Sequence, residues 1–450
     1  MLDAMVGNIS KYIAYPLWDV KDNSNKLKTV RDLEKNQWLS PAELKDRQWH
    51  ALKRTIDYAY RNSPYYGELF KSIGITPEDI KTPEDYLKIP ITTKLDIRNN
   101  TEQFISTEYS KDSLVVAKTG GSTGVSLNLY FDETCQELRN AAAIRSDRWA
   151  GWDLGHKRAA LWGNPPTPTT FKQKVRHHLL DRTIYLDTMA LNDSNMGAFV
   201  QLWAIEKPKS LFGHAHSIYM FAKYVSSKNI SDLRPQAIVA TSMMLLDHER
   251  ALIESVFNCK VTNRYGCEEV GLIGCECERH QGMHLNIDHL YVEFLDDDNK
   301  PVQAGEPGKI ILTDFNNKGM PLLRYQVEDI GVPGDKQCSC GRGLPLMQNL
   351  QGRVADFLKG SDGTLIAGIS LVERTLTHVK GLEQIQLVQT SLNRIEINRV
   401  KGVEYDEFTD KSLLKEINIV FGDDVACIIN DVTEIAQENN GKYRFSICKI

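Results

Sequence analysis

The sequence predicts an α/β protein in which a hinge joins a large N-terminal domain of several sheets to a small α+β C-terminal domain. Three observations favour this fold. Short apolar runs that end at or near glycine alternate with helical patterns over residues 132–257, as in α/β proteins. Alternating strand patterns with no helix between them follow over residues 290–315. After residue 360 a mixture of strand and helix patterns begins afresh. The length of 450 residues allows two or three domains.

The first predicted element is a long helix over residues 39–60. Ser40, Pro41 and Glu43 mark its start, because a serine cap, a proline in the first turn and a glutamate three residues after the cap are typical of helix N-termini. A second helix is expected over residues 132–152. Three short buried strands and a further helix are also expected, over residues 158–163, 209–213, 237–242 and 246–257.

The middle of the chain predicts an added β section, and the C-terminal part predicts a new domain. LYVEFLDDD and GKIILTDF alternate apolar and polar residues and are joined by the polar loop KPVQAGEPG. The C-terminal elements are strands over residues 381–390, 393–400 and 424–429 and a helix over residues 412–422. We therefore expect a large domain over residues 1–353 and a small mobile domain over residues 357–450.

The composition limits the partners and the location of the protein. The net charge is -5 and the sequence has no long lysine or arginine run, which argues against a nucleic-acid partner. No apolar stretch approaches the roughly 20 residues that cross a bilayer. The first residues lack the basic leader and apolar core of a signal peptide. We expect a cytoplasmic protein with mostly reduced cysteines, and an N-terminal arm that packs on the body rather than on a membrane surface.

A loop rich in glycine and hydroxyl groups, TGGSTG, covers residues 119–124. Such loops bind phosphates because their backbone N–H groups point inward without obstruction by side chains. The loop continues with Val125 and Ser126, and not with the lysine of Walker-type nucleotide triphosphatases. Alone, the loop also fits a flexible surface turn, so the distant segments decide its interpretation.

Four further segments follow this loop: YGCEE, RYQVED, GRVAD and GKYRF. With TGGSTG, and in this order, they resemble the motifs of the adenylate-forming ligase superfamily. The resemblance is closest to the phenylacetate–coenzyme A ligase family and its capsule-biosynthesis relatives, and it covers nearly the whole chain. It implies an AMP-forming acid–thiol ligase. ATP and a carboxylic acid would give an acyl-adenylate and pyrophosphate, the small domain would rotate, and the acyl group would pass to coenzyme A.

The resemblance also implies a role for each motif. The loop Thr119–Gly124 would close over the β- and γ-phosphates of ATP, and Tyr265 would stack on adenine. Asp329 would accept hydrogen bonds from the ribose hydroxyls, and Glu269 would help to hold Mg²⁺. Lys442 would swing in to neutralise charge on the carboxylate and the α-phosphate. A metal and an ammonium group suit this chemistry because the reaction brings several negative charges together.

The remaining implied positions complete two binding sites and the hinge. Asp356 would be the hinge residue, and Lys442, Glu269 and Thr123 would be the catalytic residues. The implied nucleotide-binding residues are Thr119, Gly120, Gly121, Ser122, Thr123, Gly124, Ser242, Tyr265, Gly266, Glu269, Asp329 and Arg353. The implied acid pocket comprises Trp162, Gly213, His214 and Ser217.

Two clusters of cysteine and histidine predict a zinc site that braces the β section over residues 267–345. Cys277 and His280 form a C-x-x-H pair, and Cys338 and Cys340 form a C-x-C pair. Four sulfur and nitrogen ligands fit a tetrahedral structural zinc. His284 is the alternative to His280, and a set of free thiols is the alternative to zinc.

Several questions stay open at this stage. The acyl acceptor could be coenzyme A, or an amine or hydroxyl on a sugar or amino-acid conjugate, and a non-catalytic nucleotide-binding module is a third alternative. The identity of the acid is not determined by the sequence. A homodimer is compatible with the sequence but not indicated by it.

Overall fold

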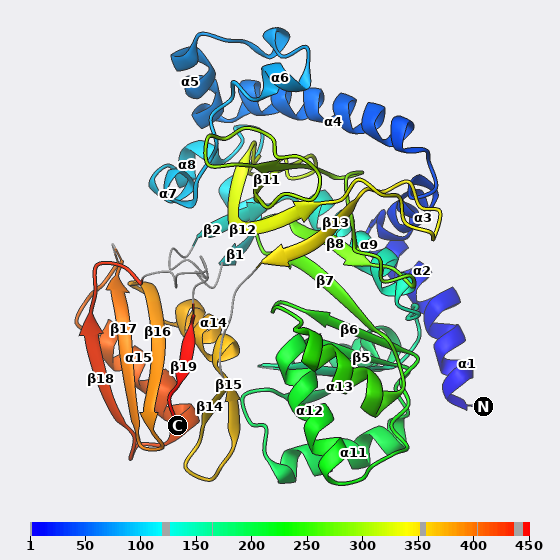
Figure 1. Ribbon diagram of the computed structural model, residues 1–450, viewed down its shortest axis with the longest axis vertical. Helices are drawn as coiled ribbons and strands as arrows, with labels where there is room; N and C mark the ends of the chain where they lie inside the picture. Colours follow the sequence, from blue (N-terminus) through cyan, green and yellow to red (C-terminus); the bar gives the residue numbers. More distant parts are fainter. Residues whose placement is uncertain (1, 119–126, 164, 352–356, 403, 436–443) are drawn as a thin grey trace.

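The computed structural model describes residues 2–118, 127–163, 165–351, 357–402, 404–435 and 444–450 (Figure 1). N-terminal helices cover one end of a long central sheet, and the C-terminal strands and helices form a separate body beside that sheet. None of the described helices is long and apolar enough to cross a membrane.

The long N-terminal helix begins where its cap predicts. α4 spans Pro41–Asn62. Ser40 Oγ accepts a hydrogen bond from the Glu43 N–H at 3.3 Å, and Glu43 Oε2 accepts one from the Ser40 N–H at 2.9 Å. This reciprocal capping box confirms the predicted start of the helix. The other elements of this region are α1 Leu2–Ile9, the π-helix η1 Ser10–Ala14, α2 Tyr15–Lys21, α3 Lys26–Asn36, α5 Pro64–Ile73, η2 Pro77–Asp79, α6 Pro83–Tyr86, α7 Lys94–Asn99, α8 Thr101–Phe104 and η3 Lys111–Ser113.

The central sheet has eleven strands among the described residues, in the order β10-β11-β12-β13-β9-β8-β7-β6-β5-β3-β4. The strands on the β4 side of β7 are parallel, and those on its β10 side are antiparallel. β7 therefore forms the junction between the two halves. The strands are β3 Arg158–Trp162, β4 Thr183–Asp187, β5 Ser210–His214, β6 Ala237–Thr241, β7 Val261–Cys267, β8 Gly271–Glu276, β9 Met283–Leu285, β10 Leu290–Leu295, β11 Gly308–Asp314, β12 Tyr325–Pro333 and β13 Leu346–Gln351.

The predicted strands and helices of this region are all present. The three apolar runs form β3, β5 and β6, and the two alternating segments form the antiparallel pair β10–β11. The helix predicted over residues 132–152 is α9, and the one predicted over 246–257 is α13. The remaining elements are β1 Val115–Lys118, β2 Asn128–Phe131, α9 Glu133–Trp149, α10 Phe171–Arg176, the π-helix η4 His177–Asp181, α11 Asp193–Glu206, α12 Ala215–Ser227 and α13 Asp247–Phe257.

The C-terminal part has its own sheet and its own core. Four strands pair in the order β18-β17-β16-β19, and α14 and α15 supply buried side chains such as Leu371, Leu413 and Ile417 to one cluster with Leu387 and Ile397 of the sheet. The predicted α+β character of this part is confirmed. Its elements are β14 Phe357–Lys359, β15 Leu365–Ala367, α14 Gly368–His378, β16 Leu382–Ser391, β17 Arg394–Lys401, α15 Thr409–Phe421, β18 Ala426–Asp431 and β19 Ser446–Cys448.

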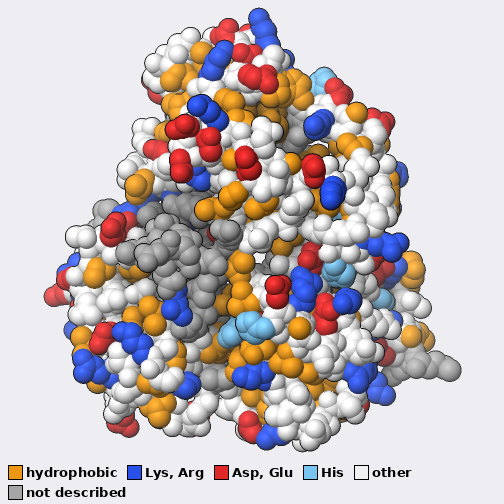
Figure 2. Space-filling model, viewed as in Figure 1, with side chains coloured by type: hydrophobic (Ala, Val, Ile, Leu, Met, Phe, Trp, Pro, Cys, Tyr) orange, Lys and Arg blue, Asp and Glu red, His pale blue; other side chains and the backbone are white. Residues whose placement is uncertain are grey.

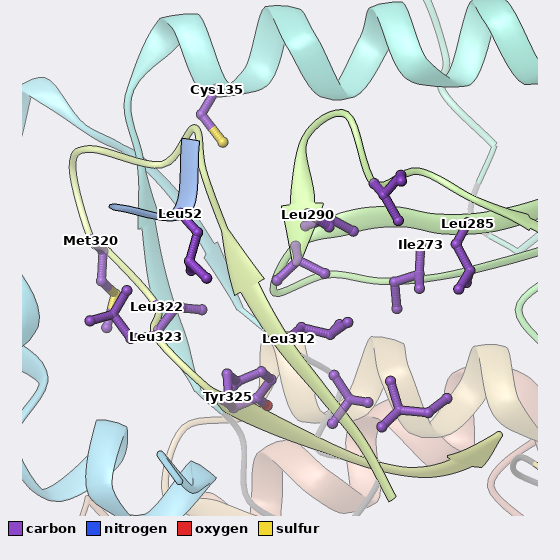
Figure 3. Packing of buried hydrophobic residues seen from close by; sticks show 14 of the residues in the cluster. Leu52, Cys135, Ile273, Leu285, Leu290, Leu312, Met320, Leu322, Leu323 and Tyr325 are labelled. Carbon is purple, nitrogen blue, oxygen red and sulfur yellow. The ribbon is translucent and has the colours of Figure 1, made fainter. Parts of the chain in front are cut away.

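The largest apolar core joins the N-terminal helices to the antiparallel half of the central sheet. It includes Leu52 of α4, Cys135 of α9, Ile273 of β8 and Leu312 of β11, and Figure 3 shows part of this cluster together with Tyr325 of β12. Burial of so much apolar surface is the main force that holds a core together. It also fixes the strands that carry the candidate site residues described below.

The visible surface is mixed in charge. Figure 2 shows lysine and arginine side chains interspersed with aspartate and glutamate over one face of the molecule, without a broad region of one sign. This agrees with the small net charge and gives no sign of a nucleic-acid-binding surface on that face.

Candidate active site and metal site

Tyr265 and Asp329 meet at the junction of the central sheet. Tyr265 lies on β7 and Asp329 on β12, and Tyr265 Oη donates a hydrogen bond to Asp329 Oδ2 at 2.9 Å. Both side chains are buried. They line a pocket of ≈ 820 Å³ together with Ser242 and Gly266. The structure thus brings together four residues that the resemblance assigned to the nucleotide.

A second pair of buried side chains lies in the same two segments of sequence. Tyr325 Oη donates a hydrogen bond to Glu269 Oε1 at 2.7 Å, and Glu269 is 4% exposed. Tyr325 was quoted above only as part of a motif, and its contact with Glu269 was not predicted. The two hydrogen bonds connect the YGCEE segment to the RYQVED segment.

Arg324, which precedes Tyr325, is fully enclosed and holds the start of β12 in place. Its guanidinium donates to both carboxylate oxygens of Glu293, at 3.0 and 3.2 Å, and to the backbone carbonyls of Leu87 and Ile89. Burial raises the pKa of the Glu293 carboxyl above its ordinary value, and the charge and hydrogen bonds of Arg324 offset only part of this rise. Such a bidentate contact is rigid because the planar guanidinium matches the geometry of the two carboxylate oxygens.

Backbone geometry restricts two positions beside the pocket. A Cβ atom on Gly266 would lie 2.5 Å from the Gly271 carbonyl oxygen, so the turn into β8 excludes any side chain there. Ser242, at the end of β6, has a φ of 64°, a left-handed conformation that is uncommon for residues other than glycine. Strained residues of this kind are frequent at binding sites.

The residues predicted for the acid pocket also lie together. Trp162 ends β3, Gly213 and His214 end β5, and Ser217 lies in the first turn of α12. The ring centroids of Trp162 and His214 are 4.3 Å apart. This is the carboxyl edge of parallel strands, where open α/β sheets bind ligands.

Two polar side chains of this group are buried without a partner among the described residues. His214 Nδ1 and Ser217 Oγ make no hydrogen bond there, although the side chains are 2% and 0% exposed. Burial lowers the pKa of His214 to about 4, so the imidazole is neutral at pH 7. Buried polar groups are normally hydrogen-bonded, and these two atoms are among several buried side-chain atoms of the described residues that have no hydrogen-bond partner.

Several predicted residues lie outside the described residues, so their positions remain predictions. These are the loop residues Thr119, Gly120, Gly121, Ser122, Thr123 and Gly124, together with Arg353, the hinge residue Asp356 and Lys442.

The structure places Cys277, Cys338 and Cys340 close together, and of the two candidate histidines it favours His284 over His280. The four candidate ligand atoms that lie within 4.8 Å of one another belong to these cysteines and to His284, not to His280. His280 lies in a tight turn with a φ of 49°, and its Nδ1 contacts Glu276 Oε2 at 3.2 Å. His284 lies on β9, whose pairing with Leu346 of β13 brings it beside the Cys340 loop.

The surroundings of the cluster suit a bound metal. His284 Nδ1 donates to the Leu344 carbonyl at 3.0 Å, which leaves Nε2, 3.4 Å from Cys340 Sγ, with its lone pair. Backbone N–H groups of Arg279 and Arg342 donate to the sulfurs of Cys277 and Cys340, both at 3.4 Å. Hydrogen bonds of this kind orient metal ligands and stabilise thiolates. The donor set of three sulfurs and one imidazole fits zinc.

The sequence of this chain is similar to the sequences of known acid–coenzyme A ligases. The chain is 24% identical over 424 residues to a phenylacetate–coenzyme A ligase of Escherichia coli, covering 89% of each chain. It is also 24% identical over 322 residues to the phenylacetate–coenzyme A ligase of Thermus thermophilus, covering 70% of this chain and 72% of the relative. The chain is thus similar in sequence to phenylacetate–coenzyme A ligases over most of its length. The predicted family resemblance and the assignment as an AMP-forming ligase are thereby confirmed.

Two further comparisons concern the fold and the C-terminal part of this chain. A 2-hydroxyisobutyryl-CoA ligase, solved with 2-HIB-AMP and CoA in the thioesterification state, superposes with a TM-score of 0.62 at 17% identity and covers 92% of each chain. At this identity the superposition shows the fold alone, and it confirms the predicted fold class. Residues 358–449 match the CapK C-terminal domain family.

Proposed function

We propose that this protein activates a carboxylic acid with ATP, forming an acyl-adenylate and pyrophosphate, and then transfers the acyl group to coenzyme A. The observation that carries the proposal is the paired arrangement of Tyr265 with Asp329 and of Tyr325 with Glu269 at the sheet junction. This arrangement lies in a chain that is similar in sequence to phenylacetate–coenzyme A ligases.

Each buried side chain has a physical task in this reaction. Asp329 accepts hydrogen bonds from the ribose hydroxyls, which a carboxylate does well because each bond is charge-assisted. Tyr265 presents its ring to adenine, while its bond to Asp329 fixes the orientation of both side chains. Glu269, a buried carboxylate, supplies the kind of oxygen ligand that Mg²⁺ takes. Bound Mg²⁺ would offset the negative charge of the phosphates.

The unpartnered groups of the acid pocket favour an acid that carries a hydrogen-bonding substituent. His214 and Ser217 present a neutral imidazole and a hydroxyl in a buried position. A wholly apolar acid would leave them unsatisfied at a cost of about 1–3 kcal/mol each. A hydroxy acid or a similar polar carboxylic acid would satisfy them.

We expect Ser217→Ala to raise the KM for the preferred acid by about tenfold, because one hydrogen bond to the bound acid is lost. The KM for ATP should stay within about twofold of wild type, since Ser217 lies away from Tyr265 and Asp329 in this proposal. Ser227→Ala, on the exposed end of the same helix, is the matched control and should change neither constant. Equal increases in both KM values for Ser217→Ala would remove Ser217 from the acid pocket.

The test of the proposed reaction is a panel of apolar and polar carboxylic acids, read by pyrophosphate release with and without coenzyme A. An acid that triggers pyrophosphate release and yields a thioester supports the proposal. No release with any acid would favour a nucleotide-binding protein without catalysis.

A second acceptor class is favoured by one observation. The match of residues 358–449 to the CapK C-terminal domain suggests a link with capsule biosynthesis, where an amine or hydroxyl of a sugar or amino-acid conjugate could take the acyl group. Amide or ester formation with such conjugates, faster than thioester formation with coenzyme A, would establish this alternative.

We also propose a structural zinc ion held by Cys277, His284, Cys338 and Cys340. All four positions would be filled by the protein, which is typical of structural sites. The ion would join the turn after β8 to the loop before β13, and so brace the β section beside the nucleotide pocket.

His284→Ala is expected to abolish zinc binding, because it removes one of four ligands, and to lower the melting temperature. His280→Ala is the matched control and should retain about one equivalent of zinc per chain. Metal content by mass spectrometry and thermal unfolding before and after chelation provide the measurements. Zinc retained by His284→Ala but lost from His280→Ala would reverse the ligand assignment.

A further inference from the structure

The N-terminal helical segment turns an uncharged, mainly apolar face to solvent. α1, η1 and α2 follow one another without a break over Leu2–Lys21 and run along the edge of the molecule (Figure 1). From residue 4 to residue 20 the charged side chains are the partly exposed Lys11, at 31%, and the buried Asp19, whereas Asp3, Lys21 and Asp22 at the two ends are exposed. The large apolar side chains on the outer face are between 38% and 79% exposed. They are Met5, Ile9, Tyr12, Ile13, Leu17 and Val20.

The opposite face of the same segment anchors it to the body, and its charges are directed inward. Lys11 Nζ donates to Asp153 Oδ2 at 2.6 Å, and Asp19 is buried and accepts from the Leu27 N–H at 3.0 Å. Tyr15 Oη donates to the Leu180 carbonyl at 2.8 Å. The polar residues therefore bind the protein, and the apolar residues are left on the outside. This is the reverse of the usual surface helix, which keeps its charged face in water.

A basic segment lies beside this apolar face. α10 and η4 carry the exposed residues Lys172, Lys174, Arg176 and His178, and Phe171 is 83% exposed. The guanidinium of Arg176 lies 5.8 Å from the ring centroid of Trp18 in α2, and Lys21 Nζ lies 4.4 Å from the same ring. Asp181 is the one acidic residue of α10–η4. Tryptophan is enriched at membrane–water interfaces, and basic side chains are attracted to anionic lipid.

We propose that the exposed face of α1–α2, together with the basic side chains of α10, docks on an anionic phospholipid bilayer. The apolar side chains would enter the boundary between headgroups and acyl chains, and the cations would contact lipid phosphates. A second copy of the chain fits this face less well. A strip of about 20 helical residues is about 30 Å long, and at about 10 Å width it offers about 300 Å², against about 800 Å² per partner in a standard protein interface.

The experiment is sedimentation of the full-length protein with phosphatidylcholine vesicles that contain, or lack, about 30 mol% phosphatidylglycerol. Binding is expected only with the anionic vesicles, and it should weaken when NaCl rises from about 0.1 M to about 1 M, because the screening length falls from about 10 Å to about 3 Å. Ile13→Glu/Leu17→Glu should bind at least about tenfold less, since two charges replace inserted apolar side chains. Lys172→Ala/Lys174→Ala should bind about 25-fold less, at about fivefold per lysine.

Ile419→Glu, an exposed isoleucine 60% accessible on α15, is the matched control and should bind like wild type. Melting temperatures establish that each variant is folded. Absence of binding by the folded wild-type protein would overturn the proposal. So would a dimer in solution that Ile13→Glu/Leu17→Glu converts to a monomer, since that result would assign the face to a second copy. The proposal does not depend on the ligase reaction, and vesicle binding is measured without substrates.

Discussion

Lys442→Ala is expected to reduce acid-dependent ATP–pyrophosphate exchange by about 10²–10³-fold, the usual cost of removing a group that stabilises charge in a transition state. The lysine would approach the carboxylate and the α-phosphate only when both are bound, so its loss should spare the binding of ATP itself. A compact ammonium group on a flexible stem suits this task. Isotope exchange and equilibrium nucleotide binding measure the two effects separately.

Lys449→Ala is the matched control, because Lys449 is an exposed lysine of the same C-terminal part. It should exchange pyrophosphate at the wild-type rate. If Lys442→Ala also kept the wild-type rate, the essential cation would have to come from elsewhere in the chain, and the role assigned to Lys442 would be wrong.

Arg324→Met is expected to lower the free energy of unfolding by about 3–5 kcal/mol, because it leaves Glu293 as a buried carboxylate without its partner. The two side chains are 2% and 7% exposed, and water cannot replace the lost contacts. The loss should also disturb the first residues of β12, including Tyr325 and its hydrogen bond to Glu269. Chemical denaturation monitored by tryptophan fluorescence provides the measurement.

Two further variants distinguish the effect of the buried Arg324–Glu293 pair on stability from the general effect of replacing an arginine by methionine. The double variant Arg324→Met/Glu293→Met should be more stable than Arg324→Met, because no charge is left without a partner. Arg394→Met, at an arginine that is half exposed and 3.7 Å from Glu396, should cost no more than about 0.5 kcal/mol. Equal losses for Arg324→Met and Arg394→Met would mean that the buried contact does not hold β12.

Elements with a clear local sequence pattern, such as a helix cap or an alternation of apolar and polar residues, were predicted from the sequence. The capping residues Ser40 and Glu43 located α4 to within a few residues, and alternation of apolar and polar residues located the β10–β11 pair. The run MLDAMVGNIS has no such signal, and its helix was not predicted, because apolar side chains such as Met5 and Ile9 lie on its exposed face. The eleven-stranded sheet order also lies beyond local reasoning, since it depends on pairing between distant segments.

The sequence suggested which residues form the candidate site, but it did not indicate the contacts between them. Ordered motifs identified Tyr265, Glu269 and Asp329, yet nothing in their spacing indicates that Tyr325 would donate to Glu269. The zinc ligands show the same limit. A C-x-x-H spacing favoured His280, whereas the register of β9 against β13 brings His284 to the cysteines. Register is a property of the folded sheet, and it turns alternate side chains to opposite faces.

We propose that this chain transfers the adenylyl group of ATP to an organic acid, and analysis of the nucleotide products tests this most directly. The protein is incubated with ATP, Mg²⁺, the carboxylate panel and coenzyme A, which takes the acyl group and releases AMP, and the nucleotide products are separated by chromatography. We predict AMP and pyrophosphate, formed only when a suitable acid is present. Formation of ADP and phosphate instead would contradict the account, since it would place the bond cleavage at the γ-phosphate and not at the α-phosphate.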